Sequence, residues 1–256
     1  MQNPPQTVGY FHTLAWNRTA AGAETNIDSA PVTDDIFQIQ NAHFFMPDDL
    51  QIVKIFASGL TLTRARLRSA KLQQTNPNYI RPINQALLPA NNANVDWFYD
   101  NPISLPQADE LILEGTVSGA GENFFVGFLR KNYQPIPAGD RYTIRRTGTT
   151  AAVDAAWTTL TQTVETNLPV GQYAIIGAEV QSTNIIGFRY IVDNQWYRPG
   201  NIGISSVANR NNWQDYAGRM GVWGVFNTLS YPRLQVLCDG ADASFEEYIR
   251  VVRVGS

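Results

Sequence analysis

Hydrophobic and polar residues alternate along most of this chain in short runs that are separated by turn-forming residues. In the runs at 50–57, 109–117 and 245–253, apolar side chains recur at about every second position, and Asn, Gly and Pro fall between the runs. A period of two places successive side chains on opposite faces of a strand. The pattern therefore predicts an all-β protein built from many short strands.

This periodicity predicts about eight strands in each half of the chain. The candidates in the first half are 8–16, 36–45, 50–57, 59–68, 78–83, 95–99, 109–117 and 122–130. Those in the second half are 141–147, 172–181, 184–192, 195–198, 202–206, 221–226, 233–239 and 245–253. One segment, 151–165, has apolar residues at helical spacing and predicts a single helix. Little helix is therefore expected.

A ten-residue pattern occurs twice, as WFYDNPISLP at 97–106 and as WGVFNTLSYP at 223–232. Both follow W-x-x-x-N-x-[I/L]-S-x-P. The positions that we single out as a repeat signature are Trp97, Asn101 and Pro106 with Trp223, Asn227 and Pro232. A sugar-stacking platform is one interpretation of these residues. We favour an architectural one, in which the Trp enters the core, the Asn satisfies a turn and the Pro starts a strand.

The similarity extends over nearly the whole chain in the same order. Residues 50–67 resemble 172–190 at an offset of 123, which pairs Ile52 with Ile175 and Arg66 with Arg189. The stretches 111–115 and 236–240 match at an offset of 125, 124–130 and 247–253 match at 123, and YIRP at 79–82 resembles WYRP at 196–199. Collinear similarity with drifting offsets indicates a tandem duplication. We expect a first unit at 1–134 and a second at 135–256.

Eight antiparallel strands in about 120 residues are typical of a jelly roll. The sequence thus predicts two tandem eight-stranded antiparallel jelly rolls. An immunoglobulin-like sandwich is the structural alternative, although its Cys…Trp…Cys pattern is absent.

Three arginines, Arg64, Arg66 and Arg68, alternate with Ala65 and Leu67 in the strand expected at 59–68. On a strand all three share one face. They form either an ordinary solvated face or a ladder that meets carboxylates on a neighbouring subunit, so they are candidate subunit-interface residues.

Composition and charge argue against several classes of function. The chain is 44% hydrophobic and only 16% charged, with a formal net charge of −3, which argues against sequence-independent or sequence-specific wrapping of nucleic acid. No apolar run is long enough to span a membrane, and the first residues lack the order of a secretory signal. The single cysteine, Cys238, cannot form an internal disulfide and reads as a buried small hydrophobe. We expect synthesis in the cytoplasm.

Candidate chemistry is sparse. The two histidines, His12 and His43, are too few to predict a metal site, and no nucleophile elbow or phosphate-binding loop accompanies them. Carboxylate doublets such as Asp109-Glu110 and Glu246-Glu247 place their side chains on opposite faces of a strand, so they are poor acid–base pairs. We therefore predict no catalytic residue, no metal and no cofactor.

The two tandem units, marked by W-x-x-x-N-x-[I/L]-S-x-P, by YIRP and WYRP, and by the Glu-Gly and Asp-Gly pairs, resemble the double-jelly-roll major capsid proteins of tailless icosahedral viruses, especially bacteriophages. The resemblance implies two jelly rolls side by side, a homotrimer that forms a pseudo-hexamer, and trimers that tile a virion shell made in the host cytoplasm. It also implies contacts with other virion proteins and sometimes with an internal membrane. The family has no catalytic motif to carry over.

Two other functions are open at this point. A glycan-cleaving amidase or hydrolase would need carboxylates that converge in a cleft, for which the candidates are Asp100, Asp109, Glu110 and Asp239. A carbohydrate-binding module would need at least two of Trp97, Trp196, Trp213 and Trp223 on one open face. The Asn-rich segments 84–94 and 205–221 are long for hairpin loops and are expected to carry contacts or function.

Overall fold

The computed structural model describes residues 11–18, 30–58, 61–69, 94–121, 123–150, 156–193, 195–203 and 219–255, and these residues form an all-β fold without a helix. Every strand pairing among them is antiparallel. The all-β prediction is confirmed. The strands of the first half are β1 (Phe11–Arg18), β2 (Ala30–Pro31), β3 (Ile39–Gln40), β4 (His43–Phe45), β5 (Leu50–Ser58), β6 (Leu62–Arg68), β7 (Asn94–Trp97), β8 (Ile103–Leu105), β9 (Glu110–Val117) and β10 (Asn123–Arg130). Those of the second half are β11 (Arg141–Thr150), β12 (Thr158–Thr159), β13 (Thr163–Val164), β14 (Gln172–Gln181), β15 (Ile185–Ile191), β16 (Gly200–Ile202), β17 (Gly224–Asn227), β18 (Arg233–Cys238) and β19 (Asp242–Gly255).

These strands form four sheets, two in each half of the chain. We call them sheet I (β3-β4-β9-β6), sheet II (β2-β1-β10-β5-β7, with β8 also paired to β5), sheet III (β12-β18-β15-β16) and sheet IV (β13-β11-β19-β14-β17). Sheets I and II contain only strands that end by residue 130, and sheets III and IV contain only strands that begin at residue 141 or later.

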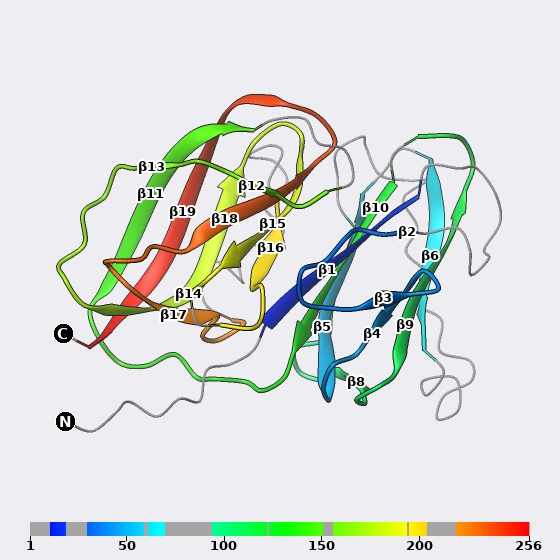
Figure 1. The fold of residues 1–256 in the computed structure, drawn as a ribbon, viewed down its shortest axis with the longest axis horizontal. Coiled ribbons are helices and arrows are strands. Elements are labelled where there is room, and N and C mark those ends of the chain that lie inside the picture. The colour runs from blue at the N-terminus through cyan, green and yellow to red at the C-terminus, as the bar shows by residue number, and fades with distance from the viewer. Residues whose placement is uncertain are drawn as a thin grey trace.

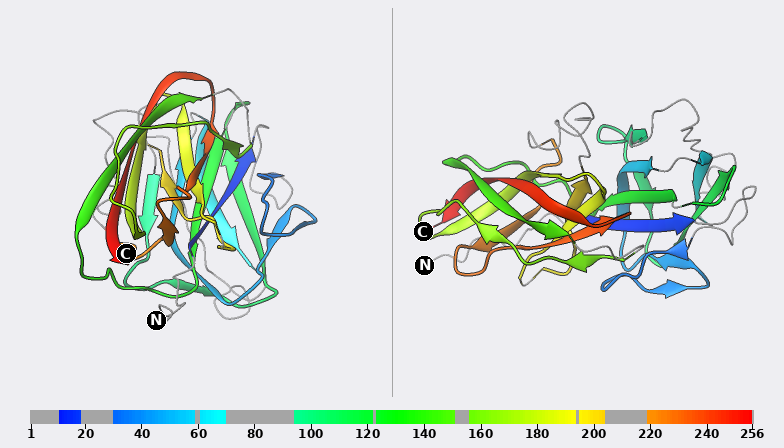
Figure 2. Two further views of the ribbon diagram at one scale, coloured as in Figure 1. Left: turned by 60° about the vertical axis from the view of Figure 1, so that its left-hand side comes forward. Right: turned by 90° about the horizontal axis from the view of Figure 1, so that it is seen from above.

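The four sheets are stacked as layers in the order I, II, III, IV (Figure 1). Sheets I and II enclose one apolar core, in which Trp16 of β1 contacts Phe44 of β4 edge to face at 5.0 Å. Sheets III and IV enclose a second core, to which Phe188 and Tyr190 of β15 and Ile249 of β19 belong. Seen from above, the second half lies beside the first along the long axis of the molecule (Figure 2).

Sheet I corresponds to sheet III and sheet II to sheet IV. In sheets II and IV the first and last long strands of each half pair with each other, β1 with β10 and β11 with β19, and the last strand then pairs with β5 or β14. In sheets I and III the strand before the last pairs with β6 or β15. Because most successive strands alternate between the two sheets of a half, each half is consistent with a jelly roll.

The equivalent strand pairs also carry the same β-bulges. The register of β10 with β5 skips Val53, and that of β19 with β14 skips Ile176. The register of β6 with β9 skips Thr63, and that of β15 with β18 skips Ile186. Both pairs of bulges differ by 123 positions, which is the offset predicted for 50–67 and 172–190.

The bulges correct two other offsets of the sequence comparison. Thr116 pairs with the residue that follows the bulge in β6, and Leu237 pairs with the residue that follows the bulge in β15. These two residues are therefore equivalent, and β9 and β18 match at an offset of 121 rather than 125. Phe128 and Arg250 are likewise equivalent, which gives an offset of 122 rather than 123 for β10 and β19. Short apolar strands align almost equally well at several offsets, so the sequence alone does not fix their register.

Two element predictions need correction, and three other predicted segments lie wholly or mostly outside the described residues. The helix expected at 151–165 is wrong over 156–165, where the chain forms β12 and β13; Thr residues favour strands, and Trp157 packs against the core instead of following a helical face. The strand expected at 195–198 is also wrong, because these residues form a bend before β16. The strand at 78–83, the segment 84–94 except for its last residue, and residues 205–218 lie outside the described residues.

Candidate functional site

Sheet II is buried on both faces, which makes its contact with sheet III the main structural site of the molecule. Every residue of β10 is buried. Phe125 and Leu129 belong to the core between sheets I and II, whereas Phe124, Val126 and Phe128 belong to the cluster that includes sheets III and IV. An antiparallel sheet commonly has one solvated face. Here the outer face of sheet II is instead covered by the second half of the chain.

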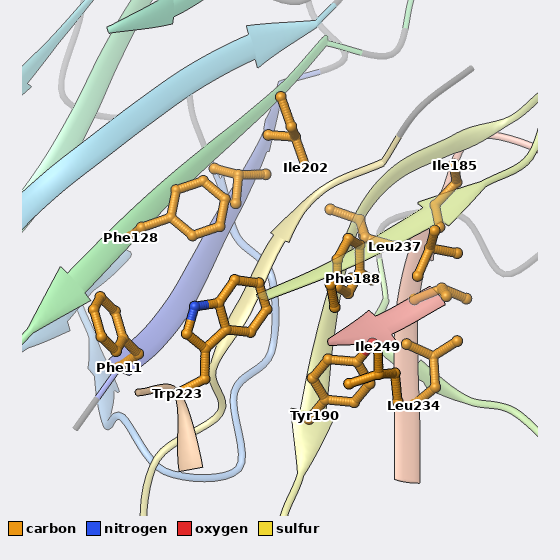
Figure 3. Close-up of a cluster of buried hydrophobic side chains, with 14 of the residues drawn as sticks. Phe11, Phe128, Ile185, Phe188, Tyr190, Ile202, Trp223, Leu234, Leu237 and Ile249 are labelled. Carbon is orange, nitrogen blue, oxygen red and sulfur yellow. The ribbon is translucent and has the colours of Figure 1, made fainter. Parts of the chain in front are cut away.

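The apolar part of this contact is centred on Trp223, whose side chain is 1% exposed. Trp223 lies beside Phe11 and Phe128 of sheet II (Figure 3). Glycine allows the backbones to come close: a Cβ on Gly200 would lie 2.7 Å from the Thr13 hydroxyl. The N–H of Thr13 donates across the contact to the carbonyl of Arg198 at 3.0 Å.

A buried arginine, Arg189 of β15, is the centre of a polar network in the same contact. Its guanidinium forms an ion pair with Asp34, a second with Asp35 at 3.1 Å, and a hydrogen bond to the Thr13 carbonyl at 3.4 Å. Its Nε donates to Gln235 at 2.8 Å. Its guanidinium also lies 4.4 Å from the ring centre of Trp157. Arg189 therefore joins sheet III to the first half of the chain.

Asp34 is fixed as an acceptor. One of its carboxylate oxygens accepts the N–H groups of Ile36 and Phe37, both at 2.8 Å, and the other contacts His12 at 3.1 Å and Arg189. Burial alone would raise the pKa of Asp34, but His12, Arg189 and the Phe37 N–H outweigh that effect and lower it. The carboxylate is ionised and compensated.

His12 has a defined tautomer in this network. Its Nδ1 accepts the N–H of Arg198 at 3.1 Å, so the ring proton is on Nε2 and is donated to Asp34 at 3.1 Å. The ring stacks on Phe37 at 4.3 Å. Burial lowers the pKa of His12, against the opposite effect of Asp34. The histidine is therefore neutral and bridges the two halves of the chain.

Two further polar contacts complete the site. Arg198 donates from Nε and from its terminal nitrogen to Asp35, at 2.9 and 2.7 Å. The ammonium of Lys54, which is fully buried in sheet II, donates to the side-chain oxygen of Asn201 in β16. The arrangement holds two sheet faces in one relative orientation.

The sequence-predicted arginine ladder lies on sheet I, away from this contact. Arg64, Arg66 and Arg68 occupy alternate positions of β6, opposite Thr116, Glu114 and Ile112 of β9. Arg68 is partly exposed and forms an ion pair with the buried carboxylate of Glu114 in its own sheet. The side chains of Arg64 and Arg66 lie outside the described part of the structure. Their role at a subunit interface stays a prediction.

The repeat-signature residues are placed differently in the two halves. At the bulge of β5, the N–H of Phe98, and not that of Trp97, donates to the Val53 carbonyl at 2.8 Å. At the bulge of β14, the N–H of Trp223 donates to the Ile175 carbonyl, also at 2.8 Å. Asn101 and Asn227 are both exposed, and the side-chain oxygen of Asn227 accepts the N–H of Leu229 at 2.9 Å. Pro106 follows β8, while the carbonyl of buried Pro232 accepts a hydrogen bond from Arg146 at 2.6 Å. An architectural role stays the interpretation of all six.

The carboxylates that a hydrolase would need lie in different surroundings. Asp109 and Glu110 lie at the start of β9, whereas Asp239 follows the end of β18, the strand equivalent to β9. Asp100 is exposed and pairs with Arg219 at 3.2 Å, and Glu110 contacts His43 at 2.9 Å. Within the described residues no group of three His, Cys, Asp or Glu side chains could hold a metal ion.

The tryptophans and the cysteine singled out in the sequence differ in exposure. Of the four tryptophans considered for sugar binding, Trp196 is 77% exposed, Trp223 is buried, and the side chains of Trp97 and Trp213 lie outside the described part. Cys238 is a buried free thiol, and burial raises its pKa to about 12. No helix of the described residues is long and apolar enough to cross a membrane.

Sequence reasoning missed Asp34, Asp35 and Arg189 as partners. One signal was available: NFFVGFLR at 123–130 is apolar at consecutive positions, which indicates a strand buried on both faces. The polar partners come from a turn and a distant strand, and no local pattern connects them.

Comparison with known proteins adds one structural similarity. No protein-family model and no curated protein matches the chain. Among solved structures, the chain is similar to the crystal structure of the major capsid protein P2 from bacteriophage PM2, with 10% identity over 96% of this chain and 98% of that one, at a TM-score of 0.24. At this TM-score the two structures do not superpose closely.

Proposed function

We propose that this protein is a structural subunit, a major capsid protein that assembles with copies of itself into a virion shell and is not an enzyme. The observation that carries the proposal is the stacking of sheet II on sheet III. Sheet II is the equivalent of sheet IV, and sheet III is the equivalent of sheet I. The contact therefore joins the outer faces of two sheets that are not equivalent to each other.

A contact between two different faces is heterologous. At each end of the stack it leaves one outer face uncovered, and these two faces are again of different sheets. Those faces are the outer faces of sheet I and sheet IV (Figure 1). Repetition of a heterologous contact closes into a ring when the rotation allows it. Two similar units per chain and three chains per ring would give a pseudo-hexamer, a shape suited to tiling a closed shell.

The division into units at 1–134 and 135–256 and their origin by duplication belong to the same proposal. The matching strand order and the matching bulges of the two halves support both. Contacts with other virion proteins and with an internal membrane remain predictions from the sequence resemblance.

The test is the solution mass of the purified protein of 28.5 kDa, measured by light scattering after size exclusion, followed by electron microscopy. We expect a homotrimer of three chains, or larger closed shells. A protein that stays monomeric at every concentration and salt tested, and forms no shells, would contradict the proposal.

A further inference from the structure

Arg130, the last residue of β10, is a buried arginine that pairs with no described carboxylate. The other two buried arginines of the described residues, Arg146 and Arg189, each form an ion pair with a buried carboxylate. Arg130 is only 7% exposed, and its Nη2 donates to the side-chain oxygen of Gln51 at 3.4 Å. Its Nε is buried and has no acceptor among the described residues. A buried charge without a counter-charge is strongly destabilising, so a guanidinium in this position favours an anion beside it.

The fold does not require a polar residue at this position. The bulge register makes Arg130 and its cross-strand neighbour Gln51 equivalent to Val252 and Ala174 of the second half. Val252 and Ala174 are buried in a small apolar cluster. The same pair of strands is therefore closed by two apolar side chains in one half, at no cost of burying a charge. The arginine in the other half needs a different explanation.

Two tyrosines lie near Arg130 at the joint between the two halves of the chain. The guanidinium carbon is 5.4 Å from the ring centre of Tyr133, which is 52% exposed. Burial lowers the pKa of Arg130, and Tyr133 and Tyr99 act in the opposite direction. Among the described residues no carboxylate contributes to this balance. Since an arginine stays charged in proteins, a positive charge is held next to the exposed ring of Tyr133.

A second arginine, Arg219, reaches the same tyrosines from the second half of the chain. Its guanidinium carbon lies 5.2 Å from the ring centre of Tyr99. Two residues later, Gly221 lies against Tyr133, so close that a Cβ on this glycine would be 3.1 Å from the tyrosine ring. The end of β10 and the segment before β17 therefore bring one guanidinium each to a single cluster of two tyrosines.

The other charges around this cluster are paired. Arg219 forms an ion pair with the exposed Asp100 at 3.2 Å, and Lys131, which follows Arg130, forms one with Asp48. The charge of Arg130 is thus the one that no described carboxylate compensates. Guanidinium groups bind carboxylates and phosphates. A phosphate presents oxygens in several directions, which suits donors that come from two separate segments.

We infer that Arg130 and Arg219 form an anion-binding site at the joint between the two halves, and that a phosphate group is its ligand. The phosphate supplies the counter-charge of Arg130 and links the end of β10 to the segment before β17. Because these two segments belong to different halves of the chain, phosphate stabilises the contact between the halves. Binding does not require self-association.

The experiment measures the melting temperature of the purified chain against the concentration of sodium phosphate, at an ionic strength held constant with sodium chloride. Phosphate at about ten times its dissociation constant should raise the melting temperature by about 3–5 °C. Arg130→Leu should lose this shift. Without phosphate it should melt at or above the wild-type temperature, because an uncompensated buried charge is removed. Arg219→Gln, at a side chain that is 43% exposed, should weaken phosphate binding by about tenfold in isothermal titration calorimetry.

The matched control is Arg233→Leu, at an exposed arginine that begins β18, and it should respond to phosphate like the wild type. Glycerol phosphate distinguishes two sources of the ligand: an equal shift indicates a phosphate monoester, and no shift indicates the free ion. If phosphate does not shift the wild type, if acetate shifts it equally, or if Arg130→Leu keeps the shift, the phosphate site is overturned. The capsid proposal is tested by solution mass and stands or falls separately.

Discussion

His12 is the residue whose protonation state is tied most closely to the contact between the two halves of the chain. Its Nδ1 is occupied by the N–H of Arg198, so a second ring proton would face a donor instead of an acceptor. The other charged groups in contact with or near the ring are Asp34, Asp35 and Arg189. Protonation therefore breaks one of the hydrogen bonds that cross the contact.

The pKa of His12 is lowered in the folded protein, so below about pH 6.5 the unfolded chain binds a proton that the folded chain resists. We expect this contribution to stability to be present above that pH and to be lost as the pH falls towards the folded pKa. The melting temperature should therefore drop between about pH 7.5 and pH 5. The pKa of Asp34 is also lowered, which adds a further loss below about pH 4.

The discriminating variant is His12→Gln, whose amide can donate to Asp34 and accept from Arg198 but does not titrate. It should flatten the melting profile between about pH 7 and pH 5. His43→Gln is the control, because His43 lies on sheet I and contacts Glu110 rather than this network. An unchanged profile in His12→Gln would show that another group governs the loss.

Among the elements, β11 and β19 differ most from their counterparts β1 and β10. The cross-strand pair Trp16 and Phe125 in the core of the first half corresponds to Arg146 and Glu247 in the second. Arg146 donates two hydrogen bonds to Glu247, at 2.7 and 2.6 Å, and a third to the carbonyl of Pro232. Tyr190 donates to the same carboxylate at 2.6 Å. The second core is thus organised around a fully satisfied ion pair.

Removal of one charge from this pair should be costly. We expect Glu247→Gln to lower the free energy of unfolding by about 3–5 kcal/mol, because Arg146 would remain buried without a counter-charge. Glu246→Gln is a matched control one residue away: its carboxylate is 45% exposed on the outer face, and loss of such a pair costs less than about 1 kcal/mol. Urea denaturation with equal slopes would compare the two. Equal losses would mean that burial of the pair contributes nothing special.

The sequence predicted the elements better than their surroundings. The strands β5, β6, β14 and β15 and their offset of 123 follow from apolar periodicity, since a bulge preserved in both copies keeps the alignment intact. The adjacent residues Glu246 and Glu247 do point to opposite faces, as the strand period requires. Glu247 is buried and Glu246 is exposed because one particular face of the strand packs on sheet III. The identity of two adjacent residues does not determine which face that is.

The helix expected at 151–165 illustrates the same limit. Spacing of Val153, Trp157, Leu160 and Val164 fits a helix, yet Leu160 donates its N–H to Leu234 of β18 and Glu165 donates its N–H to Arg145 of β11. Both edges offer unpaired backbone groups that a strand satisfies and a helix does not. Tertiary pairing therefore decided between two local patterns of similar strength.

At the scale of the whole molecule, one apolar cluster runs from Phe11 and Val126 of sheet II to Ile249 of sheet IV. Because the second core and the contact between the halves share this cluster, neither half can open without exposing apolar surface of the other. We therefore expect the monomeric chain, at a concentration low enough to prevent association, to unfold in one calorimetric transition, with equal calorimetric and van't Hoff enthalpies.

Val126→Glu tests this coupling, since the side chain of Val126 lies beside Gly187 of sheet III, where a carboxylate would be buried in the apolar contact. This variant should split the transition in two, because the contact fails while each core survives. Val126→Ala, the control at the same position, removes only methyl groups and should keep a single transition at a lower temperature. Two transitions in the wild type would instead mean that the two halves unfold independently. The contact between sheets II and III would then be stabilised by assembly and not within the single chain.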